Sequence, residues 1–124
     1  HDNIELGQIE VVSEVKDHVD FVSIISKSKG VLVPSYYPTT GEFVLLESLG
    51  MGKAIIAFNS GVHHEILQHK KNAMVSNIGD LNDFASNIIE VSNNKVLRSS
   101  LSKGAQLLYK ELTSTDKLRK NIPF

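Results

Sequence analysis

The chain has 124 residues, enough for one domain with a modest core and too few for two. A formal net charge of -1, from 13 basic and 14 acidic residues, disfavours nucleic acid as the main ligand. The absence of cysteine excludes disulfides, thiolate metal ligands and cysteine nucleophiles. No apolar run approaches the ~20 residues of a membrane-spanning helix, and no signal peptide is visible.

The first half of the chain alternates short β-branched runs with amphipathic segments. In chain order it predicts strands at 3–6 and 9–12, a helix at 17–27 that covers a sheet, a strand at 31–33, a loop at 34–41 and a helix at 42–50. Lys29 and then Gly30 end the first helix, as a cation and a glycine commonly do. Gly50 and Gly52 end the second.

The second half continues the same alternation. It predicts a strand at 54–58, a single helical turn at 64–68, a strand at 73–76, and helices at 80–91 and 96–112, followed by a polar tail. The run Ala54 to Phe58 is apolar at every position, which is typical of a parallel strand covered on both faces.

Strands and helices in this order predict right-handed βαβ units, and therefore an α/β fold with a Rossmann-like parallel sheet and helices on both faces. Ligands of such sheets bind outside the carboxyl ends of the strands. That rule selects two loops as the candidate site, 35–42 and 59–65, because each directly follows a buried strand.

The segment 33–75 carries three motifs in order. They are Pro34-Ser35 after a strand with Leu46-Glu47 and Gly52 beyond it, then Ser60-Gly61-Val62-His63-His64-Glu65, then Lys71-Asn72-Ala73-Met74-Val75. The series resembles the donor-binding, C-terminal domain of GT-B glycosyltransferases of glycosyltransferase family 4, within the group 1 glycosyl transferases. The resemblance covers roughly residues 19–110 and implies binding of a nucleotide-diphosphate sugar, with no further cofactor.

The sequence departs from the family pattern at several positions. The family places a glutamate eight positions before the one matched by Glu47, but Thr39 stands there. Glu42 lies only five positions before Glu47, about 140° away around a helix, so the two cannot share a face. Ala54 replaces the family's proline and Val62 replaces a glycine. The basic residues that the family uses on the diphosphate belong to an upstream region that this chain does not contain.

A carboxylate in the first helix after the loop can accept hydrogen bonds from both ribose hydroxyls, and Glu47 is the candidate. The alternatives for Glu47 are an exposed helical position or a pairing with Lys53. The diphosphate suits the start of the same helix, where free N–H groups and the helix dipole favour an anion. Those N–H groups, with two threonine hydroxyls, come from Thr39, Thr40, Gly41, Glu42, Phe43 and Val44. The alternative for Thr40 is plain N-capping.

Ser60 and Gly61 can bring their backbone close to the sugar or to the acceptor cleft, and a simple turn after the strand is the alternative. His63, His64 and Glu65 are adjacent, so they face different ways, and no metal site is expected. No residue is assigned a catalytic role.

Residues 1–124 are expected to form a single donor-binding domain that lacks its first strands and the N-terminal acceptor domain. The full enzyme would transfer a sugar to a glycan, lipid or other acceptor in polysaccharide biosynthesis, in the cytoplasm or at the membrane periphery. The alternatives are a sugar-nucleotide epimerase of GT-B architecture and a degenerate, non-catalytic association domain. Without the missing strands Val31 to Val33 would be an open edge, which a strand from Asn3 to Val12 would complete or a second copy would pair with.

Overall fold

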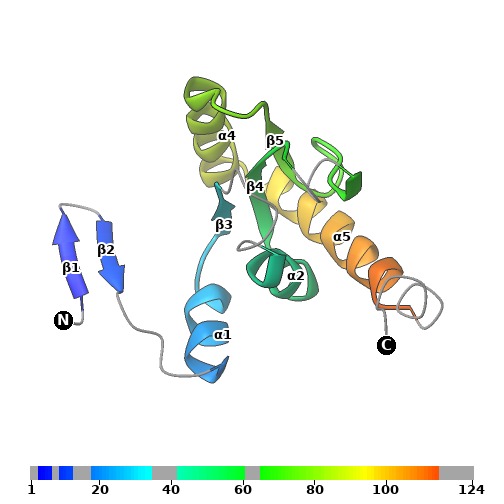
Figure 1. Ribbon diagram of the computed structural model, residues 1–124, viewed down its shortest axis with the longest axis horizontal. Helices are drawn as coiled ribbons and strands as arrows, with labels where there is room; N and C mark the ends of the chain where they lie inside the picture. The colour runs from blue at the N-terminus through cyan, green and yellow to red at the C-terminus, as the bar shows by residue number, and fades with distance from the viewer. Residues whose placement is uncertain (1–2, 7–8, 13–17, 35–41, 61–64, 115–124) are drawn as a thin grey trace.

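The computed structural model of the protein describes residues 3–6, 9–12, 18–34, 42–60 and 65–114. In chain order the elements are β1 (Asn3–Leu6), β2 (Ile9–Val12), α1 (His18–Ser26), β3 (Gly30–Val33), α2 (Glu42–Gly50), β4 (Ala54–Phe58), β5 (Met74–Ser76), α4 (Leu81–Asn93) and α5 (Lys95–Leu112) (Figure 1). Residues 65 and 66 are also helical, within the expected turn. Each of these elements lies within a residue or two of its predicted position.

The main sheet is parallel, as predicted, with the strand order β3-β4-β5. In the central strand β4 alternate side chains face opposite sides of the sheet. Ile55 and Ala57 pack into one core with residues of α2 and α5, whereas Ile56 and Phe58 pack into a second core with residues of α4. Figure 1 shows α4 on one side of the strands, and α2 with α5 on the other. Burial on both faces explains why β4 is apolar throughout.

The α4 face is held by close aromatic packing. Phe58 and Phe84 stack with their ring centroids 4.5 Å apart and their planes 23° apart. Phe58 is 2% exposed, and burying one such side chain contributes about 1.5–3 kcal/mol to stability. A stacked pair adds roughly 0.5–1.5 kcal/mol beyond area burial.

Two glycines let α5 approach its neighbours closely. A Cβ atom on Gly104 would lie 1.9 Å from the carbonyl oxygen of Lys71, and one on Gly50 would lie 2.9 Å from a ring carbon of Tyr109. Such separations are too short for carbon. The helix α5 therefore fixes both the turn before β5 and the end of α2.

The N-terminal strands do not complete the main sheet, so the first of the two alternatives predicted for its open edge was wrong. β1 and β2 pair with each other as an antiparallel hairpin in a sheet of their own, with Asn3 opposite Val12. Only two residues separate Leu6 from Ile9, and a connection of that length favours a hairpin over insertion into another sheet.

The expectation that the first helix covers a sheet was also wrong. In α1, Val19 is 73% exposed and Ile24 is 48% exposed, and Ile25 is buried. The sheet has three strands, and α2, α5 and α4 already occupy its two faces. Within the described part of the chain, no helix is both long and apolar enough to cross a membrane.

Candidate functional site

The three parallel strands end at one edge of the sheet, called here the carboxyl edge. β3 ends at Val33, β4 at Phe58 and β5 at Ser76. The helix after each of two strands begins beyond this edge, α2 at Glu42 and α4 at Leu81. This is the edge at which ligands of open parallel sheets bind.

Backbone hydrogen bonds fix the chain just after β4. The N–H of Asn59 donates to the carbonyl oxygen of Ser76 at 2.8 Å, which ties the end of β4 to the end of β5. The N–H of Ser60 donates to the carbonyl oxygen of Phe58 at 3.0 Å, so the chain turns sharply there. Ser60 is 5% exposed. It lies at the carboxyl edge, as predicted, and its contact with a sugar or acceptor stays a prediction.

A buried hydrogen bond anchors α4 to the same edge. The amide nitrogen Nδ2 of Asn87 donates to Ser76 Oγ at 2.8 Å, and both side chains are buried. Asp80 caps α4 by accepting from the N–H of Asp83 at 3.0 Å. The turn before it needs Gly79, whose φ of +83° suits glycine. These contacts hold the end of β5 and the start of α4 in one arrangement.

Sequence reasoning missed a pocket of about 400 Å³ beside the ends of β4 and β5. This carboxyl-edge pocket is lined by Asn59, Leu67, His69, Val75, Ser76 and Asn77. His69 Nδ1 accepts a hydrogen bond from the N–H of Val75 at 2.9 Å, so the neutral ring carries its proton on Nε2. The signal was present in the sequence, because polar residues directly follow two buried strands at Asn59 and Asn77.

Glu47 lies on the flank of α2 between core and solvent. Leu45 and Leu49 of the same helix are buried in the core, whereas Glu47 and Val44 are half-buried. Val44 precedes Glu47 by three residues, so the two positions are neighbours on one flank. Glu42 belongs to the same regular helix, five positions earlier, so its position is about 140° around the helix from Glu47. A shared face for the two glutamates is therefore excluded, as the spacing predicted.

The rest of the predicted diphosphate site is only partly described. Thr39, Thr40, Gly41 and Gly61 lie outside the described residues. Glu42 and Phe43 are described as the first two residues of α2, through their backbone alone. Their place at the helix start agrees with the predicted location of the free N–H groups, and the binding role of this set stays a prediction.

The region around Glu47 also contains a buried hydroxyl group, and the described residues offer no metal site. Ser48, next to Glu47, is fully buried, and its hydroxyl has no hydrogen-bond partner among the residues the structure describes. Within the same residues there is no group of three or more histidine, aspartate or glutamate side chains placed to hold a metal ion.

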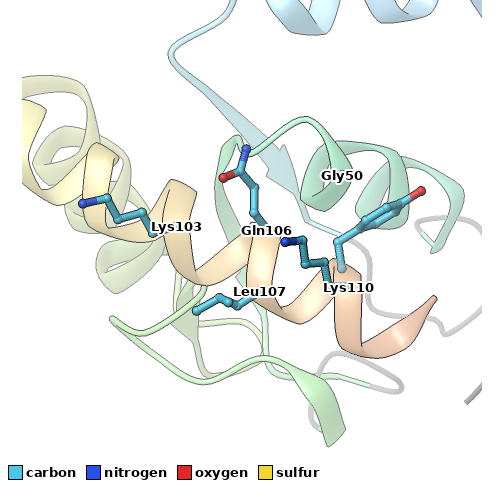
Figure 2. A pocket seen from close by; sticks show the side chains of 6 residues that line it. Gly50, Lys103, Gln106, Leu107 and Lys110 are labelled. Atoms are coloured by element: carbon cyan, nitrogen blue, oxygen red, sulfur yellow. The ribbon is translucent and has the colours of Figure 1, made fainter. Parts of the chain in front are cut away.

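A larger groove of about 540 Å³ lies on the flank of the molecule, between α2 and α5. Figure 2 shows its lining, in which Gln106 reaches toward the end of α2 and Leu107 points away from it. The α2 residue in the lining is Gly50, at the end of the helix opposite to Glu42. We therefore place the candidate site at the carboxyl edge, where the strand ends and the helix starts meet, and not in this larger groove.

Comparison with known proteins agrees with this geometry. The family described as Glycosyl transferases group 1 matches residues 2–94, well over half of the chain. The chain belongs to this family. The predicted membership in the group 1 glycosyl transferases is thereby confirmed.

A solved structure has the same fold. It is a mutant of TarM from S. aureus in complex with fondaparinux, alpha-GlcNAc-glycerol and UDP. The TM-score is 0.72 at 22% sequence identity, and the match covers 80% of this chain. The chain corresponds to only 20% of the length of TarM. A search of curated proteins found no match. The Rossmann-like fold of GT-B type is confirmed.

Proposed function

We propose that this chain is the donor-binding part of a glycosyltransferase that transfers a sugar from a nucleotide-diphosphate sugar to an acceptor. The observation that carries the proposal is the meeting of three parallel strand ends with the start of α2 at the carboxyl edge. Family membership and the likeness to a transferase crystallised with UDP support it. The finer assignment to glycosyltransferase family 4 is part of the proposal.

The two ends of the donor would meet two different features of α2. Backbone N–H groups in the first turn and the positive end of the helix dipole suit the diphosphate. Glu47 lies five residues after Glu42, the first residue of α2, which is about 7.5 Å along the helix axis. That separation allows its carboxylate to accept hydrogen bonds from the ribose hydroxyls while the phosphates stay at the helix start. The chemistry needs no cofactor beyond the sugar nucleotide itself.

The acceptor and the transfer step belong to the rest of the enzyme. Because the chain spans a fifth of the TarM length, we assign the acceptor-binding domain to other parts of the full protein. A glycan or a lipid-linked glycan is the proposed acceptor, in polysaccharide biosynthesis. The proposed location is the cytoplasm, with the full enzyme at the membrane periphery. The residues 1–124 alone are expected to bind a donor weakly and to transfer nothing.

Calorimetric titration with UDP, GDP and ADP tests the proposal. One nucleotide should bind, and Glu47→Gln should weaken that binding by about tenfold, because a charge-assisted hydrogen bond contributes about 1.5–3 kcal/mol. Glu90→Gln, an exposed glutamate on α4, is the matched control and should bind as the parent does. Binding of none of the three nucleotides, or equal losses in the two variants, would contradict the donor site.

An epimerase of the same architecture would bind the same class of ligand, so the titration cannot separate it from a transferase. An assay on the full-length enzyme can, because only a transferase consumes the donor in proportion to added acceptor. A non-catalytic association domain would bind none of the nucleotides and would form a stable oligomer. Leu32 on the open side of β3 is 47% exposed and is the place where pairing with a second copy is proposed.

A further inference from the structure

A third pocket, of about 370 Å³, lies at the amino edge of the sheet, opposite to the carboxyl edge. Lys29 immediately precedes β3, Lys53 immediately precedes β4, and Lys95 begins α5. With Arg98 these residues supply four cations to the lining of this amino-edge pocket, and no carboxylate of a described residue contributes to it. A chain with a net charge of -1 thus collects a strong local positive charge at one place.

The ammonium group of Lys53 binds carbonyl groups at the end of α1. Lys53 Nζ donates to the carbonyl oxygens of Ser26 at 2.9 Å and Ser28 at 2.8 Å. Carbonyls at a helix C-terminus carry partial negative charge, which the ammonium offsets. The third N–H of Lys53 is not used in these two bonds.

The guanidinium of Arg98 is held in the same way by the end of α4. Its Nη1 donates to the carbonyl oxygens of Val91 and Ser92, both at 2.8 Å. These bonds fix the plane of the guanidinium. They leave the Nε and Nη2 donors without a partner among the residues that the structure describes. A fixed fork of this kind suits bidentate binding of an oxyanion.

The other two cations, Lys29 and Lys95, do not bind the carbonyl groups of a described helix end. The side-chain ammonium groups of Lys29 and Lys95 make no hydrogen bond or ion pair with a described residue. Both lie beside the N-terminus of α5, whose dipole adds further positive potential. Along α5, Arg98, Ser99 and Ser102 follow Lys95 at helical spacing and all line the pocket, so two hydroxyl donors lie next to the guanidinium.

We propose that the amino-edge pocket binds a phosphate group, held by Lys29, Lys95 and the free side of the Arg98 guanidinium. An anionic, tetrahedral phosphate group matches a site with excess positive charge, the N–H fork of one guanidinium and hydroxyl donors. The group can be free phosphate or pyrophosphate, or the headgroup of an anionic lipid, because the recognising chemistry is the same.

This site is separate from the proposed donor site. The two lie at opposite ends of β4, whose five residues span about 13 Å or more at ~3.3 Å per residue. The diphosphate of a donor bound at the carboxyl edge would therefore not reach Lys29 or Lys95. The inference does not depend on the proposed transferase activity.

Two binding experiments on the 124-residue chain test the inference. Titration with sodium phosphate and with pyrophosphate, at constant ionic strength, is followed by ¹H–¹⁵N NMR. Saturable shifts are expected at the backbone of Ser28, Lys29, Ser99 and Ser102, with a Kd on the order of 1 mM. Co-sedimentation with phosphatidylglycerol vesicles, against phosphatidylcholine vesicles, tests the headgroup as the source.

The double variant Lys29→Gln with Lys95→Gln should weaken whichever binding is seen by about fivefold. The double variant Lys103→Gln with Lys110→Gln removes the same charge from exposed positions on α5 outside the pocket, and it should bind as the parent does. Circular dichroism checks that both variants fold. The inference is overturned by equal losses in the two variants, by phosphate shifts confined to Asn59, Ser60 and Asn77, or by no binding in either experiment up to about 20 mM phosphate. Binding only to vesicles, or only to free phosphate, supports it and identifies the source.

Discussion

At the carboxyl edge of the β3-β4-β5 sheet the pocket is lined by the uncharged polar side chains of Asn59, Ser76 and Asn77, whereas the pocket at the amino edge is lined by four cations. The carboxyl-edge groups are tied by hydrogen bonds between uncharged partners, such as Asn87 to Ser76. The amino-edge groups are tied by charge-assisted bonds to helix ends, such as Arg98 to Val91.

This difference separates two kinds of recognition on one small sheet. Neutral, oriented donors and acceptors distinguish ligands by shape and hydrogen bonding, and salt affects them little. Clustered cations attract any anion of suitable size, and their effect falls as ionic strength rises. Substitutions at the two edges should therefore differ in how much they change the free energy of unfolding, and also in how strongly salt alters that change.

The largest effect is expected for Gly104→Ala, because α5 packs with this residue directly against the turn before β5. In an unconstrained helix this change would stabilise by about 1 kcal/mol. Here the new methyl would collide with the carbonyl oxygen of Lys71, so we expect a net loss of about 3 kcal/mol, measured by urea unfolding. NMR shifts should concentrate on the turn that carries His69 and leave Lys29 unmoved. A stabilised variant would contradict the packing of α5 against this turn.

Arg98→Met is expected to come next, with a loss of about 2 kcal/mol. It removes two charge-assisted hydrogen bonds from the C-terminus of α4 but keeps an apolar stem of similar length. The loss should shrink when urea unfolding is repeated at 1 M NaCl. Lys103→Met on the same helix is the control and should change the free energy of unfolding very little. A loss that does not depend on salt would show that packing, not charge, accounts for the effect.

Asn87→Ala should cost slightly less, about 1.5 kcal/mol, because it leaves the buried hydroxyl of Ser76 without its donor. Unlike the Arg98 variant, it should show the same loss at low and high salt. In a double-mutant cycle with Ser76→Ala, the coupling energy should be about 1 kcal/mol. Additive losses would mean that the two side chains do not interact in solution.

The smallest effect is expected for Ser48→Ala, and it has the opposite sign. The buried hydroxyl has no partner among the described residues, so removing it should stabilise the fold by up to about 1 kcal/mol. Thermal unfolding should show a small rise in Tm. Ser76→Ala is the matched control, since it removes a bonded serine hydroxyl and should lower Tm. A destabilised Ser48→Ala would indicate that this hydroxyl has a partner in solution.

Most of the main fold could be predicted from local pattern. The continuous apolar run of β4 and the alternation of strands with helices were sufficient to predict a parallel sheet with both faces covered. The family resemblance, carried by motifs such as Pro34-Ser35 and Leu46-Glu47, correctly indicated a group 1 glycosyl transferase. The rule that ligands bind at carboxyl ends of parallel strands then located the candidate site, including the position of Ser60.

The sequence by itself therefore determined the sheet, its direction and the edge at which the candidate site is proposed, because these depend on periodicity and chain order. The two-residue connection between Leu6 and Ile9 already favours the pairing of β1 with β2. Only the tertiary structure decided that α1 leaves Val19 exposed, because this depends on which surfaces other elements already occupy. The tertiary structure also decided the clustering of four cations at the amino edge, which are Lys29, Lys53, Lys95 and Arg98. Residues far apart in the chain become neighbours only when the start of α5 packs beside the amino ends of β3 and β4.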